Sequence, residues 1–395
     1  MRIGMISIYP PQNCKHPKMG GVASYTHNLV NSISREGHDV IVFSERIQDT
    51  ESNYIENSIM IKRCWNKGII YPFQILYNII FLNLDIIHIQ HEYFLYGNGI
   101  SAALFPILQF LLKFLNKPII VTVHGVIPLS KLNDEFIKQN KLNGKKSILK
   151  STLYLFTKFI VLLSDNVIVH EDKLKDILVE EYKCNNSKIC VIHHGIENRT
   201  DIIENNRAKQ MLSQENKKIV LFFGYLTGYK GIELLIESFD HIYNKDIMLI
   251  IAGGEHPRLR GEESYKDYIN ELKNMAKRKN IIFTDFIPEE RIGLYFSAAD
   301  VVVCPYTVFM AGSGSLALSM AYFRPFIVSE ELKDMIKSDQ LTFKNDARDL
   351  AKKIDMILDA NSPLKSYSLK LCNVIREQRS WSIVSKKTCE LYKRL

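Results

Sequence analysis

The chain has 395 residues, of which 46% are hydrophobic and 24% are charged, an ordinary composition for a globular protein. At about 150 residues per domain, this length predicts two or three domains. The formal net charge of +8 favours anionic partners such as nucleotides, phospholipid headgroups or nucleic acid, without choosing among them. The 7 cysteines are dispersed and form no C-x-x-C pair, which argues against a disulfide framework and a zinc site and favours a reducing cytoplasm.

The first predicted strand covers residues 2–8. Its apolar run is too short for the core of a signal peptide, and no small-residue cleavage site follows, so export is not expected. The longest apolar segment, residues 103–115, is interrupted by Pro106, Gln109 and Lys113 and is shorter than the ~18 residues of a bilayer-spanning helix. We therefore expect a cytoplasmic protein that can still contact the inner face of a membrane.

Short runs rich in isoleucine and valine alternate with helix-compatible stretches in the first half of the chain. This alternation predicts β-α-β units, with strands at residues 2–8, 39–43, 85–89, 118–123, 166–170 and 188–192. Unbroken apolar runs are typical of strands that are buried on both faces. We therefore expect a parallel sheet covered by helices.

A polar stretch at residues 197–218 interrupts this pattern as a linker would. The alternation then resumes, with strands predicted at residues 218–224, 247–252, 280–284, 301–305 and 325–329, and the final stretch, 381–395, has helical spacing. Ligands of doubly wound sheets bind beyond the carboxyl ends of the strands. Two such sheets facing each other would enclose a cleft that holds the chemistry.

Residues 305–325 combine a strand end, a glycine-serine loop and a helix start. The small residues Gly312, Ser313, Gly314 and Ser315 let backbone N–H groups approach a ligand, and the helix expected near residue 316 adds its positive end. This arrangement predicts a diphosphate site. From the segment alone, a serine that merely caps the helix is an equally good interpretation.

Two further junctions could contact phosphate. Lys230 follows the strand end at Gly224 and precedes Gly231 at a helix start, where an ammonium group can neutralise a phosphate and the backbone can come close. Gly20 and Gly21 follow the first strand and open a helix predicted at residues 24–35. The alternatives are a solvated surface lysine and an ordinary glycine turn.

Histidines occur at three predicted strand ends, residues 88–92, 122–125 and 192–195, and we expect all three ends to face the cleft. There His124 would contact sugar hydroxyls or a developing negative charge, although a buried core histidine is the common alternative. We assign His91 and Glu92 to acceptor binding and Gly195 to donor binding. Because the histidines lie on separate strands without i,i+4 spacing, no metal site is predicted.

Residues 131–158 contain seven lysines, at 131, 138, 141, 145, 146, 150 and 158, but only two acidic residues, Asp134 and Glu135. Aromatic and aliphatic side chains lie between them. Together with the apolar segment 103–115, this region could lie on an anionic membrane surface and reach a lipid-linked acceptor. A solvated face on a pair of helices is the alternative. Nucleic acid is not expected as a partner, because no recognisable reading module is present.

In this order, the motifs resemble the retaining nucleotide-sugar glycosyltransferases of the GT-B type, family 4 in the usual classification, over essentially the whole chain. Gly20-Gly21 is similar to the family's N-terminal diphosphate loop, and His124 to its donor-sugar histidine. Gly224 through Lys230-Gly231 is similar to its glycine-to-lysine-glycine element. Further matches follow in the expected sequence, at residues 251–254, 286–288, 299–301, 320–321, 324–325 and Trp381.

The resemblance implies an α/β protein with two facing Rossmann-like doubly wound domains. Residues 1–198 would bind the acceptor, residues 205–378 the nucleotide-sugar donor, and residues 379–395 would form a helix that packs back on the first domain. It also implies sugar transfer with retention, in which Lys230 and the loop N–H groups stabilise the leaving diphosphate. The implied setting is cell-surface polysaccharide or glycoconjugate biosynthesis, with neither a metal nor another cofactor.

The chain departs from the family in two respects. Met310 and Leu318 occupy the places of two glutamates, and Tyr225 that of an arginine, for which Arg258, Arg260 or Arg324 could compensate. The serine-glycine form of the loop looks like a subgroup that lacks the glutamate pair. One alternative is therefore a catalytically inactive subunit that binds or stabilises a partner enzyme. Another is a nucleotide-sugar epimerase, with Glu92 and Glu255 as its only candidate carboxylates.

Overall fold

The computed structural model describes residues 1–12, 20–139, 144–257, 259–277 and 279–395. Cys14, Lys141 and Arg258, which entered the sequence predictions, lie outside these ranges.

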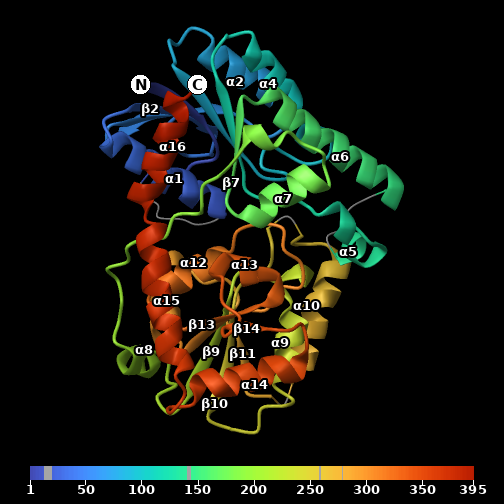
Figure 1. Ribbon diagram of the computed structural model, residues 1–395, viewed down its shortest axis with the longest axis vertical. Coiled ribbons are helices and arrows are strands. Elements are labelled where there is room, and N and C mark those ends of the chain that lie inside the picture. Colours follow the sequence, from blue (N-terminus) through green and yellow to red (C-terminus); the bar gives the residue numbers. More distant parts are fainter. Residues whose placement is uncertain (13–19, 140–143, 258, 278) are drawn as a thin grey trace.

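Two mainly parallel β-sheets form the upper and lower halves of the molecule in Figure 1. The upper sheet has eight strands in the order β3-β4-β2-β1-β5-β6-β7-β8: β1 Arg2–Ile6, β2 Asp39–Glu45, β3 Asn53–Glu56, β4 Ile59–Trp65, β5 Ile86–His91, β6 Ile119–Val123, β7 Asn166–Val169 and β8 Ile189–Val191. The lower sheet has six strands in the order β11-β10-β9-β12-β13-β14: β9 Lys218–Phe223, β10 Ile247–Ala252, β11 Ile281–Phe283, β12 Val301–Cys304, β13 Phe326–Ser329 and β14 Thr342–Phe343. The predicted architecture of two Rossmann-like sheets is confirmed.

β3, β4 and β14 were not predicted from the sequence. β3 and β4 form an antiparallel hairpin at the edge of the upper sheet, and Asn57 and Ser58 between them adopt positive φ angles of 49° and 66°. Along β3 only Tyr54 is buried, so its sequence lacks the unbroken apolar run of a central strand. β14 has two residues, which is too short to produce a pattern.

Helices fill the connections between the strands. The upper half contains α1 Gly21–Arg35, α2 Tyr71–Ile79, α3 Ile100–Ala103, α4 Phe105–Lys113, α5 Asp134–Gln139, α6 Lys146–Leu163 and α7 Asp172–Glu180. The lower half contains α8 Asn205–Met211, α9 Ile232–Ser238, α10 Glu263–Met275, α11 Glu289–Ala298, α12 Gly314–Ala321, α13 Lys333–Ile336, α14 Ala347–Leu358 and α15 Leu364–Gln378, and α16 Trp381–Lys393 ends the chain. Short 3-10 turns occur at Leu129–Lys131, Asn186–Lys188, Gly228–Lys230 and Glu330–Leu332.

The upper sheet is covered differently on its two faces. Leu29 of α1 and Val384 of α16 belong to the apolar cluster that includes Ile3 of β1. The helices α2, α4 and α6 bury their inner sides in the larger cluster on the opposite face of the sheet. Figure 1 shows these two layers, with α16 lying along α1 and far from α6.

The chain crosses between the two halves twice, and the crossings touch. The backbone N–H of Ile196 donates a hydrogen bond to the carbonyl oxygen of Arg379 at 2.8 Å. After this contact, Trp381 begins α16, which packs on α1 of the upper half. The last helix therefore returns to the first sheet, as the family resemblance implied. Within the described ranges, no helix is long and apolar enough to cross a membrane.

Candidate functional site

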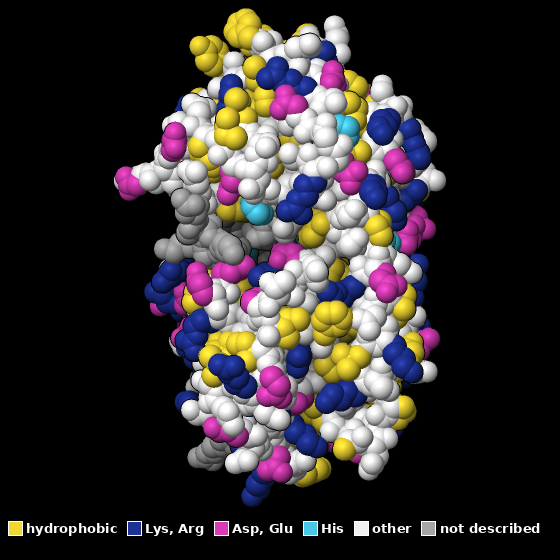
Figure 2. All heavy atoms as spheres, turned by 90° about the vertical axis from the view of Figure 1, so that its left-hand side faces the viewer, with side chains coloured by type: hydrophobic (Ala, Val, Ile, Leu, Met, Phe, Trp, Pro, Cys, Tyr) yellow, Lys and Arg dark blue, Asp and Glu magenta, His cyan; other side chains and the backbone are white. Residues whose placement is uncertain are grey.

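The two halves face each other through the carboxyl ends of their strands, and Figure 2 shows the surface hollowed at the level where they meet. We call this space the cleft. Its lower wall carries the Lys230 turn and the loop before α12. Its upper wall carries the residues that follow β5, β6 and β7.

Lys230 lies on the 3-10 turn between β9 and α9, where its side chain is 9% exposed. Its ammonium group lies against Gly224, because a Cβ built at that glycine would be 2.6 Å from Lys230 Nζ. Among the described residues, we find no carboxylate or other hydrogen-bond acceptor for this ammonium. Burial lowers the pKa of Lys230 to about 8. The site therefore holds a desolvated cation that is suited to an anionic ligand.

Gly231 makes this turn possible. Its φ of 65° lies in the left-handed region, and a Cβ at this position would be 2.0 Å from the carbonyl oxygen of Pro305. The backbones that follow β9 and β12 thus meet without room for a side chain. Lys230 and the loop after β12 are consequently held in one compact wall.

The predicted phosphate loop reaches α12 through Ser313, Gly314 and Ser315. Ser313 caps the helix, because its Oγ accepts a hydrogen bond from the backbone N–H of Leu316 at 3.2 Å. Ser315 donates its hydroxyl to the carbonyl oxygen of Phe223. Both hydroxyls are therefore engaged within the protein. The backbone N–H groups at Gly314 and Ser315 find no acceptor among the described residues and remain for a ligand.

The loop before α12 also touches the upper wall. The backbone N–H of Val126 donates to the carbonyl oxygen of Met310 at 2.7 Å, and Gly125 pairs with Ala311 in an isolated bridge. A Cβ built at Gly312 would be 3.8 Å from Cβ of His170. The cleft is therefore closed around this loop.

Met310, at the position of a family glutamate, packs into an apolar cluster that bridges the two walls. We call it the cross-cleft cluster: Tyr93, Ile127, Leu132, Phe136, Ile137, Leu149 and Leu153 from the upper half, with Val308 and Met310 from the lower half. A glutamate at position 310 would place a carboxylate against this cluster. The departure from the family pattern thus comes with a hydrophobic contact between the walls.

His124 lies at the carboxyl end of β6 and is 7% exposed. Its Nε2 lies 2.9 Å from Gln90 Oε1, and its Nδ1 lies 3.2 Å from His170 Nε2. Burial lowers the pKa of His124 well below its usual value, and the neighbouring His170 lowers it further. A neutral His124 with both ring nitrogens engaged can contact a sugar only if it exchanges one of these partners.

Of the two residues assigned to acceptor binding, His91 does not face the cleft. Its ring is 3% exposed and packs against Phe105 at 4.4 Å between centroids, within the helix layer of the sheet. Likewise His88, which we also expected at the cleft, bonds to the hydroxyls of Tyr392 and Thr122 at 2.6 and 2.7 Å beneath α16. Successive side chains of a strand point to opposite faces of the sheet. His88 and His91 therefore lie on opposite faces, and each ring is buried in the helix layer that covers its face.

Glu92 is the residue of this set whose side chain is open to solvent. Desolvation by the surrounding protein raises the pKa of its carboxyl to about 7. Its charge also raises the pKa of Tyr229, which reaches about 12 mainly because of burial. Tyr229 precedes Lys230, so Glu92 faces the Lys230 turn across the cleft.

The remaining predicted donor contacts lie at helix starts and at the chain crossing. Gly20, with a φ of 77°, precedes α1, and no described atom would contact a Cβ at Gly20 or Gly21. Gly195 has another structural explanation, because a Cβ there would be 2.4 Å from the ring of Trp381. The packing of α16 therefore requires a glycine at position 195, whether or not a donor binds nearby.

The arginines proposed to compensate for the missing family arginine are placed differently. Arg324 donates to the carbonyl oxygens of Tyr322 and Ser297 at 3.0 and 3.1 Å, inside the lower half. Arg260 lies 3.5 Å from Glu255 and is exposed. Neither is shown beside Lys230. Among the described residues, no cluster of His, Cys, Asp or Glu could hold a metal ion.

Three ion pairs across the halves were not foreseen from the sequence. Glu331 of the lower half contacts Lys131 and Lys173 of the upper half, each at 3.1 Å. Arg379 contacts Glu171 at 2.7 Å, with both side chains buried. No sequence signal could have found them, because Arg379 and Glu171 are 208 positions apart and belong to no motif.

Both halves of the chain match models of known protein families. Residues 19–199 match the model of Glycosyltransferase Family 4, and residues 203–376 match that of Glycosyl transferases group 1. The glycosyltransferase MJ1069 of Methanocaldococcus jannaschii is 24% identical over 411 residues, covering 96% of each chain.

Two other relatives match over shorter stretches. Alpha-monoglucosyldiacylglycerol synthase of Streptococcus pneumoniae is 26% identical over 334 residues, 78% of this chain and 66% of that protein. The putative glycosyltransferase YtcC of Bacillus subtilis is 42% identical over 92 residues, 23% of this chain and 22% of its own length.

Solved structures share the fold over the whole chain. Sucrose-phosphate synthase from Thermosynechococcus elongatus has a TM-score of 0.79 at 18% identity, covering 100% of this chain and 98% of its own. Anabaena Alr3699/HepE in complex with UDP-glucose has a TM-score of 0.74 at 14% identity, covering 100% of both chains.

Proposed function

We propose that this chain, which belongs to the GT-B glycosyltransferases of the family 4 type, transfers a sugar from a nucleotide diphosphate sugar to a saccharide or lipid-linked acceptor. The buried ammonium of Lys230, which lacks an acceptor among the described residues, carries this proposal. The UDP-glucose bound by Alr3699/HepE and the name of the related monoglucosyldiacylglycerol synthase support the donor class and a lipid acceptor.

The chemistry follows from where charge develops. When the bond between the anomeric carbon of the sugar and the phosphate oxygen of the donor breaks, negative charge grows on the leaving diphosphate. Lys230 and the N–H groups at Gly314 and Ser315 are in place to stabilise that charge, which is electrostatic catalysis. The acceptor oxygen would bond to the anomeric carbon on the face from which the diphosphate leaves, and its hydroxyl proton would pass to a phosphate oxygen of the leaving group. This route retains the anomeric configuration and requires no carboxylate base.

The direct test is removal of the cation. Lys230→Ala should lower the turnover number by about 100-fold to 1,000-fold, the usual effect of removing one group that stabilises a transition-state anion. Lys352→Ala, on the exposed side of α14, is the matched control and should leave turnover unchanged. Full turnover by the Lys230 variant would overturn the proposal. The anomeric configuration of the product, read by NMR, tests retention.

An inactive subunit that stabilises a partner enzyme is the second candidate, and the packing of Met310 in the cross-cleft cluster favours it. A thermal-shift panel of nucleoside diphosphates and their sugars separates the two. A ligand at about 100 times its Kd should stabilise the protein by about 2.7 kcal/mol. A flat panel would support the subunit, and nucleotide release that requires an acceptor would support the transferase.

We further propose a role in cell-surface polysaccharide or glycoconjugate biosynthesis, with the protein bound peripherally to an anionic membrane and working without a metal. Lys230 supplies the positive charge at the diphosphate that a divalent cation supplies in other transferases. Sugar transfer should therefore proceed unchanged in EDTA. A rate that falls with EDTA and returns with Mg²⁺ would contradict metal independence.

A further inference from the structure

The outer side of the layer formed by α2, α4 and α6 carries a large group of exposed apolar side chains. On α2, Tyr71 and Ile75 point inward, whereas Phe73 and Tyr77, two residues further along, point outward. The same inversion occurs on α4 and α6. We call the following side chains, which are 44% to 86% exposed, the apolar face: Phe73, Tyr77, Phe81, Ile107, Phe110, Phe114, Ile148, Leu155, Phe159 and Leu162.

The three helices pack side by side, so the apolar face is continuous rather than scattered. On α4, the rings of Phe110 and Phe114 lie 5.2 Å apart between centroids. Monomeric proteins rarely expose a continuous apolar patch of this kind unless it binds a partner or a membrane. By contrast, α1 and α16 on the opposite side of the sheet contain no large apolar residue that is exposed, and both helices are described throughout.

The charges on the same helices have one sign. α2, α4 and α6 contain no aspartate or glutamate, but they carry Lys113, Lys146, Lys150 and Lys158. Lys158 lies over the ring of Tyr154, and Lys113 pairs with Asp165. Lys146 and Lys150 are exposed and have no anionic partner among the described residues. On α6, Leu155 and Leu162 lie three residues before and four residues after Lys158, so this exposed lysine lies at the margin of the apolar face, whereas Lys146 and Lys150 lie on the opposite side of the helix. A lysine at the margin of an apolar face matches an anionic lipid surface.

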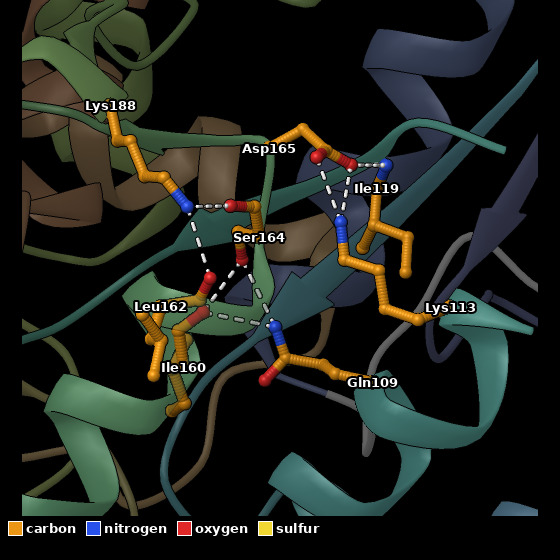
Figure 3. A network of polar contacts seen from close by, with 8 residues as sticks. All are labelled: Gln109, Lys113, Ile119, Ile160, Leu162, Ser164, Asp165 and Lys188. Carbon is orange, nitrogen blue, oxygen red and sulfur yellow. Dashed lines mark hydrogen bonds and ion pairs between the residues drawn. The ribbon is translucent and has the colours of Figure 1, made fainter. Parts of the chain in front are cut away.

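A polar network fixes α4 to the end of α6 and so keeps the apolar face in shape (Figure 3). Gln109 donates to the carbonyl oxygen of Ile160 and to Ser164 Oγ, both at 3.0 Å. Lys188 donates to the carbonyl oxygens of Leu162 and Ser164 at 3.0 and 2.7 Å. The last carbonyls of α6 are thereby satisfied beneath the sheet edge, while the side chain of Leu162 remains outside.

α6 also connects the apolar face to the cleft. Its first turns place Leu149 and Leu153 in the cross-cleft cluster beside Met310, whereas the neighbouring Ile148 and Leu155 belong to the apolar face. A surface that binds the outer side of α6 is therefore one helix diameter, about 10 Å, from the loop before α12.

We infer that the apolar face docks on an anionic lipid bilayer, with the aromatic side chains of α2 and α4 inserted and Lys158 of α6 at the headgroups. The proposed function includes membrane association, and the apolar face is the surface that would carry it. The inference rests on the proposed function only for why the protein would be at a membrane. A bilayer fits better than a protein partner, because the outer sides of the three helices present aromatic side chains and Lys158 but no acidic group for specific pairing.

The test is co-sedimentation of the full chain with vesicles of phosphatidylglycerol and phosphatidylcholine in equal parts, and with phosphatidylcholine alone. The wild type should sediment with the mixed vesicles, and less at high salt. The triple variant Phe73→Ser, Tyr77→Ser, Phe110→Ser should bind at least about tenfold more weakly. Replacing Lys158 by Gln should weaken binding roughly fivefold, on the anionic vesicles alone.

Tyr243→Ser is the matched control, since Tyr243 is 89% exposed in the lower half, away from the three helices. It should bind vesicles like the wild type. Circular dichroism shows whether the triple variant folds. If it does not, the Lys158→Gln variant alone decides the inference.

Three outcomes would overturn the inference: a wild type that stays in solution with both vesicles, folded variants that bind like the wild type, and a lipid-free dimer that the triple variant converts to a monomer. The last would assign the face to a second copy. Vesicle binding without sugar transfer would count against the proposed function and leave this inference standing.

Discussion

The two walls of the cleft differ in how their polar groups are satisfied. On the lower wall, Lys230 is buried without a described acceptor, and the N–H groups at the start of α12 are likewise unpaired. On the upper wall, His124 and His170 are bonded to each other and to further protein groups. The lower wall is therefore prepared for an anion, whereas on the upper wall the described histidines His124 and His170 are already paired and Glu92 is exposed.

The largest expected effect comes from the backbone of the lower wall. Gly231→Ala should reduce turnover by more than about 100-fold, because the shifted turn would move Lys230 away from the position in which it stabilises the leaving diphosphate. The reason is the contact of 2.0 Å between a Cβ and the carbonyl oxygen of Pro305. Steady-state kinetics measures the turnover of the variant, and thermal unfolding measures its stability.

Gly37→Ala is the control for strain alone, since Gly37 has a φ of 84° and no described atom near a Cβ. It should lower stability by about 1 kcal/mol without changing turnover. Equal effects of the two variants on turnover would show that the packing after β9 and β12 does not position Lys230.

The second effect concerns stability and belongs to the upper wall. Glu171→Leu should destabilise the protein by about 3–5 kcal/mol, because Arg379 would remain buried without its carboxylate. The double variant Glu171→Leu, Arg379→Met should recover much of this loss. Denaturant unfolding gives both values, and a double variant no more stable than the single one would contradict the ion-pair explanation.

The third effect is a pH dependence carried by Glu92. Its raised pKa of about 7 means that the carboxylate is ionised above pH 7 and protonated below it. If the ionised form contacts the acceptor, kcat/KM for the acceptor should rise with pH through about 7. Glu92→Gln should remove this rise while the affinity for nucleotide stays unchanged. A rise that persists in the variant would assign it to another group.

The smallest effect concerns the contact between the walls at Glu331. Glu331→Gln removes the charge that holds Lys131 and Lys173, which lower the pKa of this carboxyl. Because the contacts are partly exposed, we expect a loss of about 1 kcal/mol, seen as a donor KM about fivefold higher at low salt. At high salt, variant and wild type should converge.

The sequence predicted the lower wall better than the upper one, for a physical reason. Gly224, Lys230 and Gly231 lie within eight positions, so local turn geometry determines their arrangement. His88 and His91 were placed wrongly because a strand end does not reveal which face a side chain takes. The edge strand β3 lacks an apolar run, Lys62 and Arg63 interrupt that of β4, and Met310 meets its cluster only after folding. The ion pair of Arg379 with Glu171 depends on tertiary structure throughout.

Binding of nucleoside diphosphate to the wild type as a function of pH tests the central claim most directly. If the ammonium of Lys230 binds the diphosphate, affinity should be nearly constant below its pKa of about 8 and fall above it. From one ionisation, affinity at pH 9 should be about tenfold weaker than at pH 7. Lys230→Met should bind weakly with no such fall. A wild-type affinity that is independent of pH from 7 to 9 would contradict the account.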